Sequence, residues 1–254
     1  MARSITYTAL PDIPLVQPGD DIAAIIIAGL KAADLVLQDG DIIVIAQKII
    51  SKSENRYVDL ADLTPSAQAR ELAEITGKDA RHIEAVLSES TEVLRAKKNV
   101  MIVAHRLGYV MANAGIDESN IAHGDGSQVL LLPVDPDRSC AELKAALDRA
   151  CHVSIGVIIN DSFGRAWRNG VVGVALGAAG IPSLHNMIGS PDLFGRAMKV
   201  TEVAVADELA AAASLAMGQG AEGTPIVHVR GYSNAASENN AAALIRPKHM
   251  DMFR

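Results

Sequence analysis

Two short apolar runs, neither of them interrupted by a charged residue, limit the fold of this chain more than any other feature of its sequence. Residues Ile42–Ala46 form the first run, and residues 153–159 form a second that ends directly before Asn160 and Asp161. Runs of this length are typical of strands that are buried on both faces of a sheet. We therefore predict a central sheet with helices packed on it.

Helix and strand patterns follow one another along the chain without strict alternation. Helices are predicted over residues 22–35, 65–77, 79–90, 139–151 and 201–217, and further strands over residues 100–105, 109–113, 128–132 and 226–230. The Gly-rich stretch 170–180 predicts a close-packed strand or turn in which backbones approach each other. We expect an α+β fold with mixed sheets and packed helices, as a single domain over residues 1–254 or as two interleaved subdomains.

Charge and composition argue against several classes of function. The chain has a net charge of −7, three Phe, one Trp and four Tyr, so it lacks the positive field and the stacking platforms of nucleic-acid binders. Its two cysteines, Cys140 and Cys151, fit no metal or disulfide framework, which is typical of a reducing cytoplasm. There is no signal-peptide pattern and no apolar run long enough to span a membrane, and we predict a cytoplasmic protein.

Two loops carry the carboxylates that are the strongest candidates for a metal site. Asp117 follows a predicted strand and a Gly turn, and Asp161 follows the second apolar run. Aspartate oxygens suit hard divalent cations such as magnesium and manganese, and the hydroxyl of Ser162 can reach the same ion. Simpler interpretations stay open at this point: an Asx turn at Asp117, and an Asp-Ser cap on the segment after Asp161.

Basic and Gly-rich segments supply candidates for binding phosphates. Lys48 and Lys52 flank a predicted strand end, and Arg165 and Arg168 are able to hold phosphate or carboxylate oxygens with forked hydrogen bonds. The loop 217–225 contains three glycines, whose backbone amides can approach an anion closely. Solvated side chains, and a helix C-cap followed by a turn, are the alternatives.

The histidines show no spacing typical of a metal site or a catalytic triad. His82 lies on a predicted helix and His105 near a predicted strand end, and neither has a neighbouring nucleophile. We interpret both as structural or solvated side chains.

A series of motifs runs in order along almost the whole chain. It includes Gln-Lys-Ile-Ile-Ser-Lys at 47–52, Asn-Ala-Gly-Ile-Asp at 113–117, Leu-Leu-Leu-Pro at 130–133, Asp-Ser-Phe-Gly-Arg at 161–165, Pro-Asp-Leu-Phe-Gly-Arg at 191–196, Ala-Asp-Glu-Leu at 206–209 and Met-Gly-Gln at 217–219. No single motif is decisive. The ordered series resembles the F420-0:gamma-glutamyl ligase family.

This resemblance implies a reaction and an assembly. Members of the family use GTP to activate the terminal carboxylate of F420-0 and then attach L-glutamate through an amide bond, and repeated cycles add further gamma-linked glutamates. We expect the activated species to be an acyl phosphate. The resemblance also implies magnesium or manganese, assistance by potassium, and an intertwined homodimer with an α+β fold.

The resemblance places site residues on matching positions of this sequence. The expected metal ligands are Asp117, Asp161, Ser162 and Gln219, and the expected catalytic residues are Asp117, Asp161 and Arg165. The expected GTP contacts are Leu10, Pro11, Asp12, Ile13, Gln47, Lys48, Lys52, Asn120, Met217, Gly218, Gln219, Gly220, Ala221, Glu222, Gly223 and Thr224.

Two features depart from the family pattern. Relatives often carry an acidic residue near Asn186, and the Gly-rich loop differs from its commonest forms. The substrate end of the site can therefore differ from that of other family members. The chain resembles the stand-alone form of the family, without a C-terminal flavin-dependent domain. The alternatives are a ligase for a different acid or amine acceptor, a non-catalytic GTP-binding module, and a metal-dependent phosphohydrolase.

Overall fold

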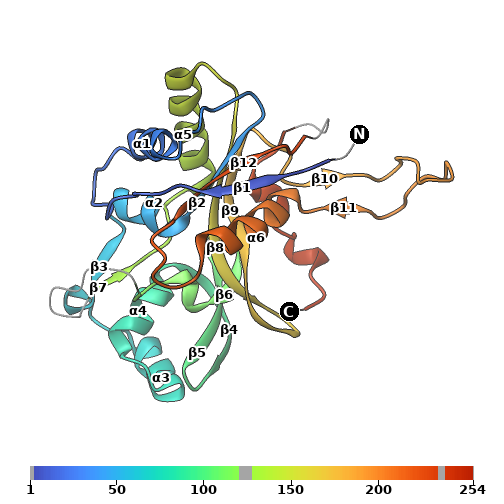
Figure 1. Ribbon diagram of the computed structural model, residues 1–254. Coiled ribbons are helices and arrows are strands. Elements are labelled where there is room, and N and C mark those ends of the chain that lie inside the picture. Colours follow the sequence, from blue (N-terminus) through green and yellow to red (C-terminus); the bar gives the residue numbers. More distant parts are fainter. Residues whose placement is uncertain (1–2, 120–127, 234–237, 254) are drawn as a thin grey trace.

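The computed structural model describes residues 3–119, 128–233 and 238–253, and its centre is a five-stranded sheet (Figure 1). The strands of this sheet are β1 (Thr6–Ala9), β2 (Ile42–Ala46), β8 (Gly156–Arg165), β9 (Arg168–Ala179) and β12 (Ile226–Arg230). They lie in the order β1-β12-β2-β8-β9. Strands β2 and β8 run parallel, and every other pair of neighbours in this sheet is antiparallel. The predicted mixed sheet is therefore confirmed.

Three helices pack on the sheet, and each begins or ends with a residue suited to that position. They are α1 (Ile22–Ala32), α5 (Pro136–Cys151) and α6 (Val205–Met217). The carboxylate of Asp21 accepts a hydrogen bond from the backbone amide of Ala24 at 3.1 Å and so caps α1. Helix α6 ends at Gly218, whose φ of +74° favours glycine.

Strand β2 is buried on both faces, as its apolar sequence predicts. Ile43 and Ile45 belong to the core cluster that α1 and α5 cover, whereas Ile42 and Val44 belong to the cluster that α6 covers. This division follows from the two-residue period of a strand, whose successive side chains point to opposite faces. The sheet is thus the middle layer of the molecule.

The Gly-rich strand β9 allows backbones to approach closely, as the sequence indicates. A Cβ atom added at Gly173 would lie 2.2 Å from Ser214 Oγ in α6, and one added at Gly177 would lie 2.3 Å from the carbonyl oxygen of Pro136 in α5. Neither glycine can be replaced without displacing a helix. Both sides of β9 therefore set how closely the helices pack.

A second region lies below the central sheet in Figure 1 and has its own small core. Its α-helices and antiparallel strands are α3 (Ala67–Thr76), α4 (Ala80–Ser88), β4 (Ser90–Lys97), β5 (Val100–His105) and β6 (Val110–Ala112), with the pair β3 (Tyr57–Asp59) and β7 (Gln128–Leu130) beside them. The predicted hairpin of residues 100–113 is confirmed by the pairing of β5 with β6. The predicted helix over residues 65–77 is present as α3, and Ser66 caps it, because Ser66 Oγ accepts a hydrogen bond from the amide of Ala69 at 3.1 Å.

Several elements differ from the sequence-based expectation. The predicted strand end at Asp161 is wrong, because β8 continues to Arg165 and pairs with β9 beyond that point, with Asp161 opposite Val174. Lys48 and Lys52 do not flank a strand end: both follow the end of β2 at Ala46 and lie within a short helix, α2 (Gln47–Ser53). Strands β1 and β4 were not predicted. Strand β4 carries a polar sequence, and its pairing with β5 contains two register shifts.

The remaining elements are short. A two-stranded arm, β10 (His185–Asn186) and β11 (Glu202–Val203), extends away from the body of the molecule (Figure 1). The 3-10 helices are η1 (Leu60–Asp62), η2 (Asn113–Gly115), η3 (Ala241–Leu244) and η4 (Lys248–Met250). Among the described residues, the structure contains no helix with the length and apolarity that crossing a membrane requires. The architecture is α+β with several sheets, as predicted; the division into domains stays a prediction.

Candidate active site

Four segments that are distant in the sequence meet at one edge of the central sheet: the ends of β1 and β2, the part of β8 near Asp161, and the glycine loop (residues 217–225) that leads into β12. The amide of Leu10, after β1, donates to the carbonyl of Ile226 at 2.9 Å. The amide of Ala46, at the end of β2, donates to the carbonyl of Pro225 at 2.8 Å and pairs in register with Asn160 of β8. It follows that the end of the glycine loop, the start of α2 and the part of β8 near Asp161 are neighbours, as the predicted site requires.

Asp117 enters this site from the second region. Asn113 and Ala114 have φ values of +50° and +54°, and Gly115 follows at +67°, so the chain turns sharply before it reaches Asp117. The backbone of Asp117 then exchanges two hydrogen bonds with Leu130, at 3.0 and 2.9 Å. The predicted turn is present, and the carboxylate leaves it toward α2.

Helix α2 holds the Asp117 carboxylate with two side chains. Gln47 Nε2 donates to Oδ2 at 2.7 Å, and Lys48 Nζ lies 3.3 Å from Oδ1. Ser51 Oγ donates to Gln47 Oε1 at 2.9 Å, so the amide group presents its NH₂ to Asp117. Burial and the charge of Lys48 both lower the pKa of Lys52, while Asp117 opposes that change. Two lysines close to each other favour an anion between them.

Asp161 faces the same space from β8. Burial, reinforced by the negative charge of Asp117, raises the pKa of Asp161 to about 7, although the amide of Ser162 and the charge of Lys48 act in the opposite direction. On the neighbouring position, Ser162 Oγ donates to Gln219 Oε1 at 2.9 Å. The side chains that the sequence predicts as metal ligands thus come close in two pairs, Asp117 with Asp161 through their charges and Ser162 with Gln219 through a hydrogen bond.

The donor set fits a hard divalent cation. Two carboxylates that repel each other, a hydroxyl and an amide oxygen are the kinds of oxygen ligand that magnesium and manganese prefer. Within the described part of the chain, no group of three or more His, Cys, Asp or Glu side chains is placed to hold a metal. Magnesium held by one or two carboxylates commonly keeps further coordination positions for phosphate oxygens.

The glycine loop already binds an anion through its backbone. The amide of Gly220 donates to Glu222 Oε2 at 2.7 Å, and backbone hydrogen bonds within residues 219–222 lower the pKa of Glu222. The loop is closed by Thr224 Oγ1, which donates to the carbonyl of Met217 at 3.0 Å. The alternative of a helix C-cap is also realised, because the amide of Gly218 donates to the carbonyl of Ser214 at 3.1 Å. The two interpretations do not exclude each other.

Several predicted residues lie at the margin of this cluster or outside it. The side chain of Leu10 is fully buried, whereas Asp12 is exposed with a φ of +57°. Arg165 lies four residues beyond Asp161 on β8, about 13 Å along an extended strand, and its Nη1 is 3.5 Å from the carbonyl of Gly170. Its catalytic role stays a prediction. Asn120 lies outside the described residues.

Sequence reasoning missed two sets of polar contacts near the site. His82 is buried, with Nδ1 2.7 Å from Oε1 of Glu118, the residue after Asp117. Glu89 forms ion pairs with Arg56 and Arg106, which are separated from it by 33 and 17 positions. No local pattern signals contacts at such separations. The interpretation of His82 and His105 as structural is consistent with their burial.

Comparison with known proteins matches this arrangement to one family. The model of the F420-0:gamma-glutamyl ligase family matches residues 12–231. The chain belongs to this family. It is 45% identical over 252 residues to the coenzyme F420:L-glutamate ligase of Methanothermobacter thermautotrophicus, covering 98% of this chain and 99% of the relative. The enzymes of the same name from Methanopyrus kandleri and Methanocaldococcus jannaschii are 44% and 43% identical, covering 94% and 87% of this chain and 93% and 88% of those relatives.

Membership of the F420-0:gamma-glutamyl ligase family identifies the chain as an amide-forming ligase. The matched range contains Asp117, Asp161 and the loop 217–225, so the whole cluster lies inside the part of the chain that defines the family. The cluster at the edge of the sheet is therefore the candidate active site of this ligase.

Proposed function

We propose that this protein uses GTP to join L-glutamate to F420-0, and that it adds further gamma-linked glutamates in later cycles. The observation that supports this proposal is the convergence of Asp117 and Asp161 with Lys48 and the glycine loop at one edge of the sheet. Carboxylates for a metal, a lysine for phosphate and amides for close approach are the parts that phosphoryl transfer needs.

The proposed chemistry has two steps. A carboxylate oxygen of F420-0 attacks the γ-phosphorus of GTP, the bond from that phosphorus to the bridging oxygen breaks, and GDP leaves with the bond's electron pair. The resulting acyl phosphate then reacts with the glutamate amine, which forms the C–N bond of the amide while inorganic phosphate leaves and the amine loses a proton. Phosphorylation is needed because an oxide ion is a poor leaving group, whereas phosphate is a good one.

The residues of this chain act by positioning and charge. Asp117, Asp161, Ser162 and Gln219 would hold magnesium or manganese, which when bound neutralises charge on the phosphates. Lys48 and Lys52 bring positive charge to the same place, and we propose that the loop amides near Gly220 contact phosphate oxygens once Glu222 moves aside. Potassium is proposed as an accessory cation.

Three alternatives differ in the products that they predict. A related ligase would act on another acid or amine acceptor, a GTP-binding module would bind without turnover, and a phosphohydrolase would release phosphate without glutamate. The experiment is to incubate the protein with GTP, manganese, F420-0 and glutamate and to measure product masses. Products heavier by glutamyl units support the proposal. Continued release of inorganic phosphate in the absence of glutamate, or binding with no product, would contradict it.

A role for Asp161 is tested in the same assay. We expect Asp161→Ala to abolish GTP-dependent ligation while the circular dichroism spectrum stays that of the folded protein. Near-normal turnover in this variant, with manganese still bound, would remove Asp161 from the mechanism.

We also propose that the protein is a homodimer. The arm beyond β10 and β11 carries large apolar side chains with almost no cover in a single chain: Leu193 is 99% exposed, Phe194 81% and Val200 84%. Exposed apolar groups of this size on a projecting segment are typical of a protein interface. A second copy of the chain is the proposed partner.

A further inference from the structure

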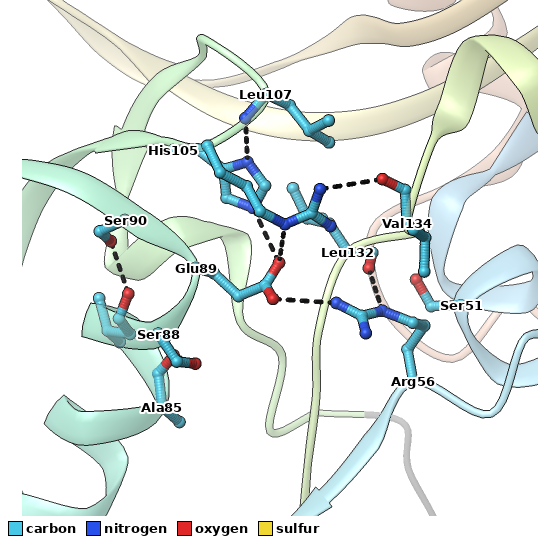
Figure 2. A network of polar contacts seen from close by, with 12 residues as sticks. Ser51, Arg56, Ala85, Ser88, Glu89, Ser90, His105, Leu107, Leu132 and Val134 are labelled. Atoms are coloured by element: carbon cyan, nitrogen blue, oxygen red, sulfur yellow. Dashed lines mark hydrogen bonds and ion pairs between the residues drawn. The ribbon is translucent and has the colours of Figure 1, made fainter.

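A cluster of charged side chains around one buried carboxylate lies where the second region meets the segment after β7, outside the proposed ligand set (Figure 2). Its centre is Glu89, the residue directly after α4. The side chain of Glu89 is only 10% exposed. Arg56 Nη2 lies 3.1 Å from Oε1, Arg106 Nε lies 2.9 Å from Oε2, and His105 Nε2 lies 3.4 Å from Oε2. Burial acts to raise the pKa of Glu89, but His105 and the two guanidinium groups outweigh it and bring the pKa to about 2.

The partners of Glu89 also hold the backbone that follows β7. Arg56 Nε donates to the carbonyl of Leu132 at 2.8 Å, and Arg106 Nη1 donates to the carbonyl of Val134 at 3.0 Å (Figure 2). Each arginine therefore bridges the Glu89 carboxylate and one carbonyl. The carboxylate is the group that keeps both arginines in place, since each would otherwise be partly buried without a counter-charge.

Two routes lead from this cluster to the carboxylate of Asp117. On the first, Tyr57 follows Arg56 and pairs with Leu130, and Leu130 exchanges two backbone hydrogen bonds with Asp117. On the second, α4, which ends just before Glu89, carries His82 against Glu118, the residue after Asp117. The cluster thus braces the strand that pairs with Asp117 and the helix that packs behind it.

We propose that Glu89 is a positioning residue, which fixes Asp117 where it can share a divalent cation with Asp161. The inference rests on the proposed function, because it assigns Asp117 to a metal. The physical reason is that Asp117 and Asp161 belong to different parts of the molecule, so their separation depends on how firmly those parts are joined. Residues that orient metal ligands in this way typically change metal affinity about 10- to 100-fold when they are replaced.

The chain offers a matched control at the far end of β2. Like Glu89, Asp41 is a buried carboxylate with basic partners, in this case one arginine and one histidine. Arg230 Nε lies 2.9 Å from Oδ1, and His228 Nε2 lies 2.8 Å from Oδ2. It precedes Ile42, whereas Gln47 follows the opposite end of the same strand. Replacing Asp41 removes a similar charge cluster without touching either route to Asp117.

The experiment compares Glu89→Gln with Asp41→Asn in the full-length protein. Manganese affinity is measured by calorimetry without nucleotide, and backbone hydrogen exchange is measured for the amides of Asp117 and Leu130. We expect Glu89→Gln to weaken manganese binding about 10- to 100-fold and to speed exchange at these two amides about tenfold or more. We expect Asp41→Asn to leave both measurements near the wild-type values, although both variants lower the melting temperature.

Unchanged manganese affinity in Glu89→Gln, or equal changes in both variants, would overturn the proposal. If Glu89→Gln does not fold, Arg106→Gln at a partly exposed position removes one contact of the cluster and is expected to change both measurements in the same direction by less. If the wild-type protein binds no manganese, the metal assignment of the proposed function fails. The exchange comparison then still decides whether Glu89 fixes Asp117.

Discussion

The side-chain amide of Gln47 donates to the carboxylate of Asp117 across 2.7 Å, although the two residues are 70 positions apart. Gln47 is the first residue of α2, directly after the central strand β2, whereas Asp117 arrives from the second region. Ser51 Oγ donates to the other end of the same amide at 2.9 Å. This hydrogen bond therefore links the helix that follows the central strand to the carboxylate proposed to bind the metal.

Replacing Gln47 by Leu should weaken catalysis while the fold persists. The variant removes a hydrogen bond to a charged acceptor, which is worth about 1.5–3 kcal/mol, so we expect kcat/KM for glutamate ligation to fall about 10- to 100-fold. The measurement is initial-rate kinetics at saturating GTP. Ser51→Ala, which keeps the bond to Asp117, is the control and should lose much less. Equal losses in the two variants would contradict a direct role for the Gln47–Asp117 bond.

Replacing Asp161 by Asn should stabilise the metal-free protein at high pH. The folded-state pKa of about 7 lies above the unfolded value of 3.8, so the folded protein binds more protons between these values and loses stability as the pH rises through that range. Asn cannot ionise, and we expect it to raise the free energy of unfolding at pH 8 by about 2–4 kcal/mol, with little change at pH 4. Denaturant titrations at both pH values, with a chelator present, measure this difference. A variant that is less stable than wild type at pH 8 would contradict the assigned origin of the raised pKa.

Replacing Glu222 by Ala should strengthen nucleotide binding. The Glu222 carboxylate accepts the amide of Gly220 at 2.7 Å and so competes with a phosphate for the loop. Freeing the loop amides should lower the Kd for GTP about tenfold, which is the scale of one charge-assisted hydrogen bond. Calorimetry with GTP and magnesium measures this Kd. Thr224→Val, which loosens the loop without freeing Gly220, should weaken binding instead. A higher Kd for Glu222→Ala would show that Glu222 supports the nucleotide site.

Replacing Leu193 and Phe194 together by Ser should dissociate the proposed dimer. These side chains are 99% and 81% exposed in a single chain, and burying them against a second copy is the apolar contribution that the variant removes. We expect light scattering during size-exclusion chromatography to give the mass of one chain for the variant and twice that mass for the wild type. Lys199→Ser, an exposed polar position on the same arm, should stay dimeric. A monomeric wild type would contradict the proposal.

Local patterns were sufficient for most helices and strands, because their causes lie within a few residues. The apolar run Ile42–Ala46 formed a strand buried on both faces, as predicted, and Ser66 capped α3 through a hydrogen bond to a residue three positions away. The glycines of β9 marked a place where helices approach. Boundaries failed where partners decided them: β8 runs past Asp161 because β9 pairs with it there.

The sequence by itself determined the chemical groups of the site and the order in which they occur, since its motifs fix which oxygens, amides and lysines the chain carries. Only the tertiary structure decided which of them meet. The deciding contacts join positions that are 17 to 70 residues apart: Gln47 with Asp117, Ser162 with Gln219, and Glu89 with Arg56 and Arg106. The physical reason is that such contacts form only after non-local strand pairing has closed long loops of chain, and no short segment encodes that closure.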